Sequence, residues 1–387
     1  MSDAAALYES TLAPWACRSA SSRGRRHPEP DSPTRNMFQR DRDRIIHSTA
    51  FRRLEYKTQV FVNHEGDHYR TRLTHSIEVA QIARSICRTL RLHEDLAEGV
   101  ALAHDLGHTP FGHSGQDALD AAMKPYGGFE HNRQSLRVIE KLERRYAAFP
   151  GLNLSFETRE GIVKHTSPHD TPRNADLAEY RLDEQATLEA QVANLADEIA
   201  YNNHDVDDGF RAGILDIEAL NAVPLFAMHY EQALRAHPGM DDALAVHETV
   251  RRMINHLIVD VVEETTRRIR EAGVESLDDV RRADRALVGF SREVRRMNAE
   301  MKRFLYQNMY RHYRVVRMAE KAQRVVRELF HAYMDNPAML PPGVTSRMDG
   351  QGDDASRARV IADYIAGMTD RYALDEYGRL FDVHARS

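Results

Sequence analysis

Cysteine is scarce in this chain. Two cysteines, Cys17 and Cys87, occur among 387 residues. Two thiols cannot build a disulfide framework or a thiolate zinc site, so nitrogen and oxygen must hold any metal ion. The sequence also lacks a signal-like apolar segment and any apolar run of about 18 residues. We therefore expect a cytoplasmic protein with no membrane partner.

An excess of positive charge is also missing. The chain has 53 Lys and Arg against 59 Asp and Glu, a net charge of −6. This balance argues against a dedicated polyanion-binding protein, although the arginines could be concentrated locally. The apolar content of 42% is enough for a full core, in one large domain or in two or three smaller ones.

Alternation of period two is absent over any useful length, whereas a helical period runs through most of the chain from Met37 onward. The sequence therefore predicts an all-α fold. Residues 18–35 are rich in Ser, Pro and Arg and poor in large apolar side chains, so they predict a flexible segment. Residues 341–356 carry turn residues and predict a loop. We expect a flexible arm over residues 1–36, a helical core over 37–215, and a C-terminal helical region over 216–387 that packs on the core.

Histidine is concentrated in the segment VALAHDLGHTPFGH, residues 100–113. Its apolar period ends at His104 and Asp105, and Gly107 follows as a helix stop signal, so this pair is predicted in the last helical turn. In residues 73–90, His75 shares a helical face with aliphatic side chains and is predicted to point inward. In residues 188–209, Asp197 lies on a face of alanines that allows another element to approach closely.

These four side chains predict a metal site. Imidazole and carboxylate ligands suit Mn, Fe, Zn, Ni or Co, and Mg among the harder ions. The purely structural alternative is that His75 is an ordinary core histidine and that His104 and Asp105 cap the end of a helix. Against it, a buried aspartate without a cation or hydrogen-bond donors costs several kcal/mol.

Five segments in order resemble a known family: FQRDRDRIIHSTAFRRLEYKTQV, RTRLTHSIEVAQIARSI, AHDLGHTPFGHSGQDAL, FEHNRQSL and LADEIAYNNHDVDDG. Together they resemble the HD-domain metal-dependent phosphohydrolases, and within them the dGTP triphosphohydrolase-like branch. The resemblance covers residues 37–213 and continues more loosely beyond them. It implies an HD-domain helical bundle that hydrolyses a deoxynucleoside triphosphate to deoxynucleoside and triphosphate.

The resemblance also implies roles for residues, as follows. The metal ligands would be His75, His104, Asp105 and Asp197. The catalytic group would comprise His108, His113, His131 and Gln116. The substrate-binding group would comprise Arg72, Gln59, Arg53, Tyr201 and Asp205, with Gln59 and Asp205 reading the 3′-hydroxyl and Arg53 equally well a solvated surface charge.

Gln116 departs from the family pattern, which commonly has a carboxylate three residues after the histidine at position 113. Glutamine accepts a hydrogen bond but cannot accept a proton. The departure predicts a general acid and base function weakened by about 10² to 10⁴ in rate, with metal and substrate binding unaffected.

Two other functions stay open at this point. One is a different HD-type nucleotide phosphohydrolase. The other is a regulator that binds nucleotides or single-stranded nucleic acid, because basic residues alternate with tyrosines over residues 295–327. An amphipathic helix with a solvated basic face is the simpler explanation of that stretch, and we favour it. The family and the apolar residues 253–262 also predict a homo-oligomer.

Overall fold

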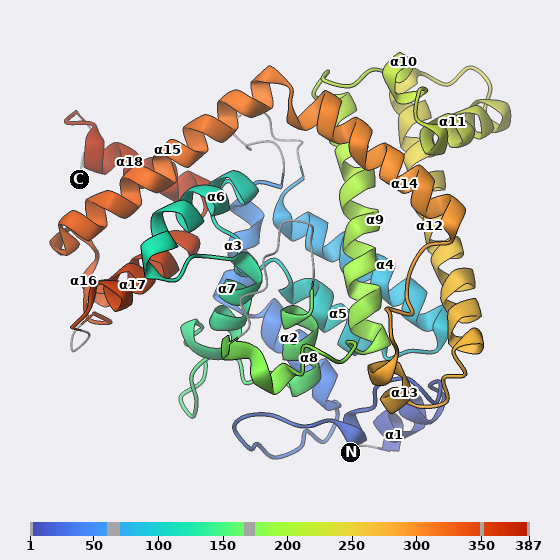
Figure 1. Ribbon diagram of the computed structural model, residues 1–387, viewed down its shortest axis with the longest axis horizontal. Coiled ribbons are helices and arrows are strands. Elements are labelled where there is room, and N and C mark those ends of the chain that lie inside the picture. Colours follow the sequence, from blue (N-terminus) through green and yellow to red (C-terminus); the bar gives the residue numbers. More distant parts are fainter. Residues whose placement is uncertain (1–2, 60–69, 166–174, 349–351, 385–387) are drawn as a thin grey trace.

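The computed structural model describes residues 3–59, 70–165, 175–348 and 352–384, and the fold is all-α as the sequence predicts (Figure 1). Within these ranges the chain forms isolated β-bridges but no strand. The helices of the first half are α1 (Asp3–Ser10), α2 (Met37–Ile46), α3 (Thr49–Arg53), α4 (Arg72–Leu90), α5 (Glu94–Ala103), α6 (Gly112–Met123), α7 (His131–Arg137), α8 (Phe156–Val163) and α9 (Leu188–Arg211). Those of the second half are α10 (Ile217–Leu220), α11 (Pro224–Ala236), α12 (Asp242–Glu271), α13 (Leu277–Arg282), α14 (Arg292–Leu305), α15 (Tyr313–Asp335), α16 (Pro342–Thr345), α17 (Asp354–Ala366) and α18 (Asp370–Phe381).

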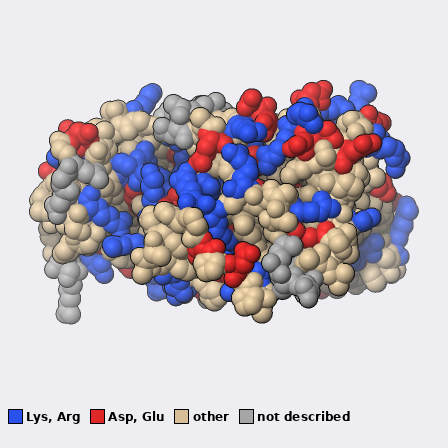
Figure 2. Space-filling model, turned by 90° about the horizontal axis from the view of Figure 1, so that it is seen from below, with Lys and Arg blue, Asp and Glu red and all other residues tan. Residues whose placement is uncertain are grey.

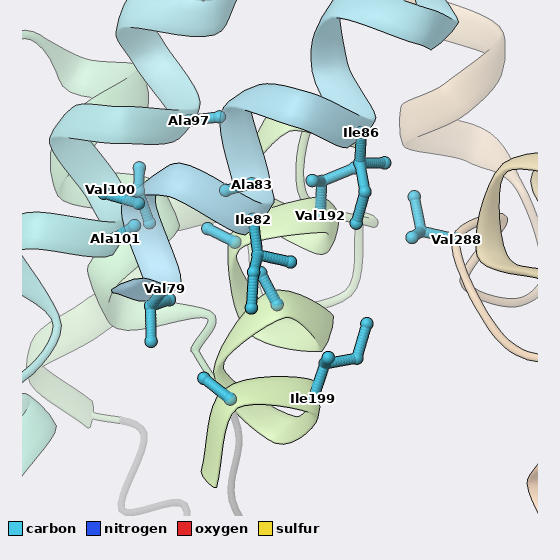
Figure 3. Packing of buried hydrophobic residues seen from close by; sticks show 14 of the residues in the cluster. Val79, Ile82, Ala83, Ile86, Ala97, Val100, Ala101, Val192, Ile199 and Val288 are labelled. Carbon is cyan, nitrogen blue, oxygen red and sulfur yellow. The ribbon is translucent and has the colours of Figure 1, made fainter. Parts of the chain in front are cut away.

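Helices α4, α5 and α9 form the centre of the molecule. A capping box fixes the start of α4. The side chain of Thr71 accepts a hydrogen bond from the backbone N–H of Thr74, and the side chain of Thr74 accepts one from the backbone N–H of Thr71. The predicted inner face of this helix is confirmed, since His75 and the aliphatic residues that follow it at helical spacing are buried. Figure 3 shows these aliphatic side chains meeting those of α5 and α9. Alanines at the contacts let the three helices approach closely.

The N-terminal segment differs from the flexible arm that its composition predicts. The Arg25 guanidinium lies 2.6 Å from the carboxylate of Asp41 on α2, and both side chains are buried. The second oxygen of Asp41 accepts from the backbone of Ser155 and the hydroxyl of Thr158 at the start of α8. The segment lacks large apolar residues, as predicted, but buried ion pairs and hydrogen bonds to distant residues offset its loss of conformational entropy.

The buried apolar residues form two clusters. The larger one joins α2, α4, α5 and α9 to α11, α12 and α14, and the smaller one joins α6 to α15 and α17. Helix α15 belongs to the smaller cluster; it starts near the end of α14 and runs over α6 toward the C-terminal helices, as Figure 1 shows. Most apolar residues of the segment 253–262 contact the larger cluster, while Val259 stays 47% exposed. The apolar surface that we associated with an oligomer is therefore mostly used within the chain.

The loop between α5 and α6 is held from both sides. Helix α5 ends at Ala103, so His104 is its C-cap and Asp105 lies in the following turn, slightly earlier than predicted. A Cβ atom at Gly107 would lie only 2.1 Å from the backbone nitrogen of Ser135, so only glycine allows α7 to dock there. From the other side, Asp370 accepts hydrogen bonds from the backbone N–H groups of Thr58 and Phe111.

The charged surface is uneven. Figure 2 shows Lys and Arg gathered over the middle of one face, with Asp and Glu mixed among them elsewhere. The net negative charge thus coexists with locally concentrated arginine. Among the described residues, no helix is long and apolar enough to cross a membrane.

The buried pair of Arg25 and Asp41 gives the first prediction. Asp41→Asn keeps the shape of the side chain but leaves the buried Arg25 only the more distant carboxylate of Glu29, 3.9 Å away, so we expect a loss of about 3 kcal/mol in the free energy of unfolding. Urea denaturation measures it. The control is Glu231→Gln, which removes an exposed ion pair with Arg235 and should cost less than about 1 kcal/mol. Equal losses in the two variants would contradict a buried anchoring role for this pair.

Candidate metal centre and its surroundings

Four side chains from three helical elements meet at one point. Nε2 of His75 lies 2.8 Å from Oδ1 of Asp197. Nε2 of His104 lies 3.3 Å from Oδ1 of Asp105 and 3.6 Å from Oδ1 of Asp197. His75 begins the inner face of α4, the His104 and Asp105 pair follows α5, and Asp197 projects from α9. The packing of these helices therefore brings together the four predicted ligands.

The donor set fits a divalent cation. One ligand atom from each of His75, His104 and Asp105 lies within 4.8 Å of the others. Ligand atoms about 2.1 Å from a common ion, at angles between octahedral and tetrahedral, are about 3.0 to 3.4 Å apart. The distances around Asp197 and His104 are close to this range. Two imidazoles and two carboxylates also match the ligands that divalent transition metals prefer.

The hydrogen bond of His104 prepares its ring for a metal. Nδ1 lies 2.6 Å from the carbonyl oxygen of Ala101, which can only accept, so Nδ1 carries the proton and donates. The lone pair of a neutral ring is then on Nε2, which faces the two carboxylates. An outer hydrogen bond of this kind is usual for histidine ligands, because it fixes both tautomer and orientation.

Electrostatics keep the two carboxylates ionised. Burial alone would raise the pKa of Asp105, but the Arg72 guanidinium 2.9 Å away and the nearby His104 hold the pKa below its usual value. Burial is likewise outweighed at Asp197, where His104, His165 and His75 hold the pKa well below its usual value. The centre therefore presents negative charge at neutral pH, as cation binding requires.

A second histidine group lies beside the centre. The rings of His108 and His131 stack with centroids 4.1 Å apart, and the ring of His113 lies 5.3 Å from that of His108. Nε2 of His108 is 3.5 Å from Oδ1 of Asp105, which links this group to the centre. Burial lowers the pKa of His108 and of His131 well below the usual value, so both rings are neutral at pH 7.

Gln116 is hydrogen-bonded to His131. Its side-chain oxygen accepts from Nδ1 of His131 at 2.7 Å and from the backbone N–H of the same residue. The Nδ1 atom is also 3.2 Å from a carboxylate oxygen of Glu130. Glu130 is itself fixed in place, because its carboxylate caps the start of α7. A carboxylate is thus present beside this histidine although position 116 lacks one.

Several predicted substrate-binding residues have buried hydrogen-bonding atoms that are unused. Among the described residues, the buried Oε1 of Gln59, Oδ1 of Asp205 and Nε of Arg72 have no hydrogen-bond partner. Burial raises the pKa of Asp205 well above its usual value, so this carboxyl can donate as well as accept. Tyr201, one turn before Asp205 on α9, is partly buried, and its ring stacks against that of Tyr310 with centroids 6.3 Å apart.

Arg53 is brought elsewhere. Its Nη1 donates to the carbonyl oxygen of Gly367 at 2.9 Å, and its exposed side chain lines a cavity of about 430 Å³ between α3 and the C-terminal helices. The lining of this cavity includes none of the four predicted metal ligands. Arg53 therefore contacts the residue that follows α17, and its role as a substrate contact stays a prediction.

Several residues near the site were missed by sequence reasoning. His165 has Nε2 3.4 Å from Oδ2 of Asp197, and Tyr310 donates to Oδ2 of Asp205. Lys57 donates to the carbonyl oxygens of His108 and Ala366, and Glu130 contacts His131 as described above. Tyr310 ends a single π-helical turn, a feature common at functional sites, within the tyrosine-rich run already noted. His165 and Lys57 carry no comparable signal.

Comparison with known proteins gives two family matches and many full-length relatives. Residues 72–202 match the HD domain, and residues 288–379 match the phosphohydrolase-associated domain. The chain is 58% identical to the deoxyguanosinetriphosphate triphosphohydrolase-like protein of Ralstonia nicotianae over 97% of this chain and 96% of the relative. Proteins described in the same words from Bordetella pertussis and Geobacter sulfurreducens are 58% and 53% identical, over 98% of this chain and 99% and 97% of their own lengths.

Lys57 gives a prediction on pH dependence. Burial lowers the pKa of its amine to about 7 from the usual 10.5. Between these values the unfolded chain binds a proton that the folded chain does not, so this group makes the protein more stable as pH rises from about 7 to about 10.5. The difference in free energy of unfolding between wild type and Lys57→Met should therefore grow across that interval. Urea denaturation at several pH values measures it, with the exposed Lys141→Met as control for the lost charge. A difference in free energy that does not change with pH would show that the pKa of Lys57 is not lowered.

Proposed function

This chain belongs to the family of deoxyguanosinetriphosphate triphosphohydrolase-like proteins, and on that premise we propose that it hydrolyses deoxynucleoside triphosphates to deoxynucleoside and intact triphosphate. The observation that carries the proposal is the meeting of two histidines and two ionised aspartates next to a separate histidine group in which the rings of His108 and His131 are neutral. The first group suits a divalent cation, and the second suits proton transfer. Metal-dependent phosphate hydrolysis needs both.

His75, His104, Asp105 and Asp197 would hold the ion. When bound, such an ion supplies Lewis-acid stabilisation of negative charge on a phosphate oxygen. The choice among Mn, Mg, Fe, Ni, Co and Zn depends on the coordination geometry of the site and on which metal is available in the cell. Arg72 supports the arrangement from its buried position against Asp105, and its free Nε is a donor for the substrate phosphates.

The hydrolysis joins a water oxygen to the α-phosphorus and breaks the bond from that phosphorus to the 5′-oxygen of the sugar. The departing 5′-oxygen needs a proton, and the attacking water must lose one. His108, His113 and His131 are the candidate donors and acceptors. The two of these rings with lowered pKa are neutral at pH 7, so each can accept a proton from water and later release it.

Recognition of the sugar 3′-hydroxyl would come from Gln59 and Asp205. Each has a buried side-chain oxygen with no partner among the described residues, and such atoms favour a ligand that supplies a hydrogen bond. Tyr310 holds the other oxygen of Asp205, which fixes the orientation of the carboxyl group. Tyr201 contributes a neighbouring ring from the same helix. A substrate 3′-hydroxyl that donates to the side-chain oxygen of Gln59 and accepts from the protonated carboxyl of Asp205 would be recognised by hydrogen bonds rather than by shape alone.

Activity against purified nucleotides tests the proposal. We expect triphosphate, detected by ³¹P NMR, from one or more dNTPs in the presence of Mn²⁺ or Mg²⁺, and a loss of at least about 100-fold in Asp197→Asn. Cyclic nucleotides and nucleoside monophosphates are the matched alternatives. Turnover of those compounds without turnover of dNTPs would instead indicate another HD-type nucleotide phosphohydrolase.

The acid and base assignment gives a separate prediction. We infer that Glu130 supplies His131 with the carboxylate that Gln116 does not. Glu130→Gln should lower kcat about 10- to 100-fold with little change in KM, and Gln116→Glu should restore kcat in that background. An added carboxylate stabilises the imidazolium form, so Gln116→Glu should also move the limb of the pH profile that belongs to His131 to higher pH. Normal kcat in Glu130→Gln would contradict this assignment.

Two predictions on partners stay predictions. A homo-oligomer is expected from the family, and light scattering that gives a single 44.3 kDa species would contradict it. Binding of single-stranded nucleic acid draws support from Tyr306 and Tyr313, which are 59% and 55% exposed at the junction of α14 and α15 among basic residues. Steep salt dependence of such binding would support it, because phosphate contacts release counterions.

A further inference from the structure

The outer face of His75 contacts a second histidine that has no role in the reaction described so far. Nδ1 of His75 lies 3.3 Å from Nδ1 of His204, and the two rings are nearly perpendicular at 85°. The opposite nitrogen of His204, Nε2, lies 2.9 Å from Oε2 of Glu78. Both histidines are buried, with exposed fractions of 1% and 3%. A continuous row of contacts thus joins the candidate centre to a carboxylate at the surface.

The contacts allow one arrangement of protons on neutral rings. If Nε2 of His75 binds a cation, its proton must be on Nδ1, which then donates to Nδ1 of His204. His204 must in turn carry its proton on Nε2, which donates to Glu78. The carboxylate can only accept, so it fixes the direction of the whole row. Every nitrogen in the row then has a partner that matches it.

Glu78 is itself held in place. Nε of Arg70 lies 3.2 Å from the same carboxylate oxygen, and Nη1 of Arg70 lies 2.8 Å from Asp207 and 3.0 Å from Asp208. Although 42% of the Glu78 side chain is exposed, this arginine restricts its position. The row therefore ends on a fixed negative charge.

The two helices support each other through this row. Helix α4 provides His75 and, three residues later, Glu78 on the same side. Helix α9 provides Asp197 and, two turns later, His204. The second histidine of the centre, His104, instead donates to a carbonyl of its own helix, whose position the backbone fixes. His75 lies in the first turn of α4, where its partner must come from another element.

We propose that His204 and Glu78 are positioning residues that hold the His75 ring in the tautomer and orientation required for cation binding. This inference rests on the proposed function only in taking His75 as a ligand. Removing an outer partner of a histidine ligand typically weakens metal affinity about 10- to 100-fold. The alternative role for His204 is simple packing between α4 and α9, which any side chain of similar size would fulfil.

The test is the affinity for Mn²⁺, measured on the full chain by the electron paramagnetic resonance signal of free Mn²⁺. His204→Phe keeps the ring volume but removes both hydrogen bonds, and we expect its Kd to rise about 10- to 100-fold. His204→Asn retains an acceptor near the position of Nδ1 but loses the contact with Glu78, so its Kd should lie between those of wild type and His204→Phe. Glu78→Gln should raise Kd by a smaller factor.

Two matched variants control for general effects. His229→Phe replaces a buried histidine whose partners are His256 and Gln232, and Glu94→Gln replaces a carboxylate that pairs with Arg88. Both should bind Mn²⁺ like wild type. Thermal unfolding reports any loss of stability separately, and if His204→Phe does not fold, His204→Asn and Glu78→Gln decide the question.

The outcomes separate the two proposals. Failure of the wild type to bind Mn²⁺, Mg²⁺ or another divalent ion would overturn the metal site itself. Binding by the wild type with equal Kd values in the His204 and Glu78 variants would overturn the positioning role alone. Equal weakening in His229→Phe would also overturn it, because the effect would then be a general loss of stability. Graded weakening confined to the His204 and Glu78 variants would support it.

Discussion

Confinement of two carboxylates and two imidazoles to one point in the interior is the constraint on which this structure depends. The negative charges of two neighbouring carboxylates repel each other, and burial disfavours the ionised form of each. The arrangement persists because Arg72 and the surrounding histidines stabilise Asp105 and Asp197, and because the helices that carry the groups are fixed by aliphatic packing. The alanines of α5 and α9 matter here, since larger side chains would separate the helices and disperse the ligands.

The loop between α5 and α6 depends on parts of the chain that are distant in sequence. Lys57 and Asp370 hold the backbone between His108 and Phe111, and Lys57 also contacts the end of α17. Gly107 admits α7, which delivers His131. The C-terminal helices therefore do more than cover the core, because their polar contacts set the positions of groups in the HD-domain segment. A phosphohydrolase-associated domain that follows the HD domain in the same chain is consistent with such support.

The histidine group keeps a carboxylate beside His131 although position 116 holds a glutamine. Gln116 retains the hydrogen bond to His131 but cannot take up a proton. Glu130, the residue just before His131, lies within reach of the same nitrogen. Its carboxylate also caps α7, so one side chain serves both the helix and the histidine.

The sequence by itself determined the all-α class, the inner faces of the central helices and the four candidate ligands, because each of these follows from helical periodicity or from a local motif such as the pair His104 and Asp105. It also indicated the family through five segments in order. Only the tertiary structure decided how the N-terminal segment packs, since Arg25 pairs with Asp41 on a separate helix and donates to Asn153, which is far along the chain. The same holds for Arg53, His165, Tyr310 and the row from His75 through His204 to Glu78. Contacts between side chains on different helices depend on the rotation and offset of those helices, and no local pattern encodes them.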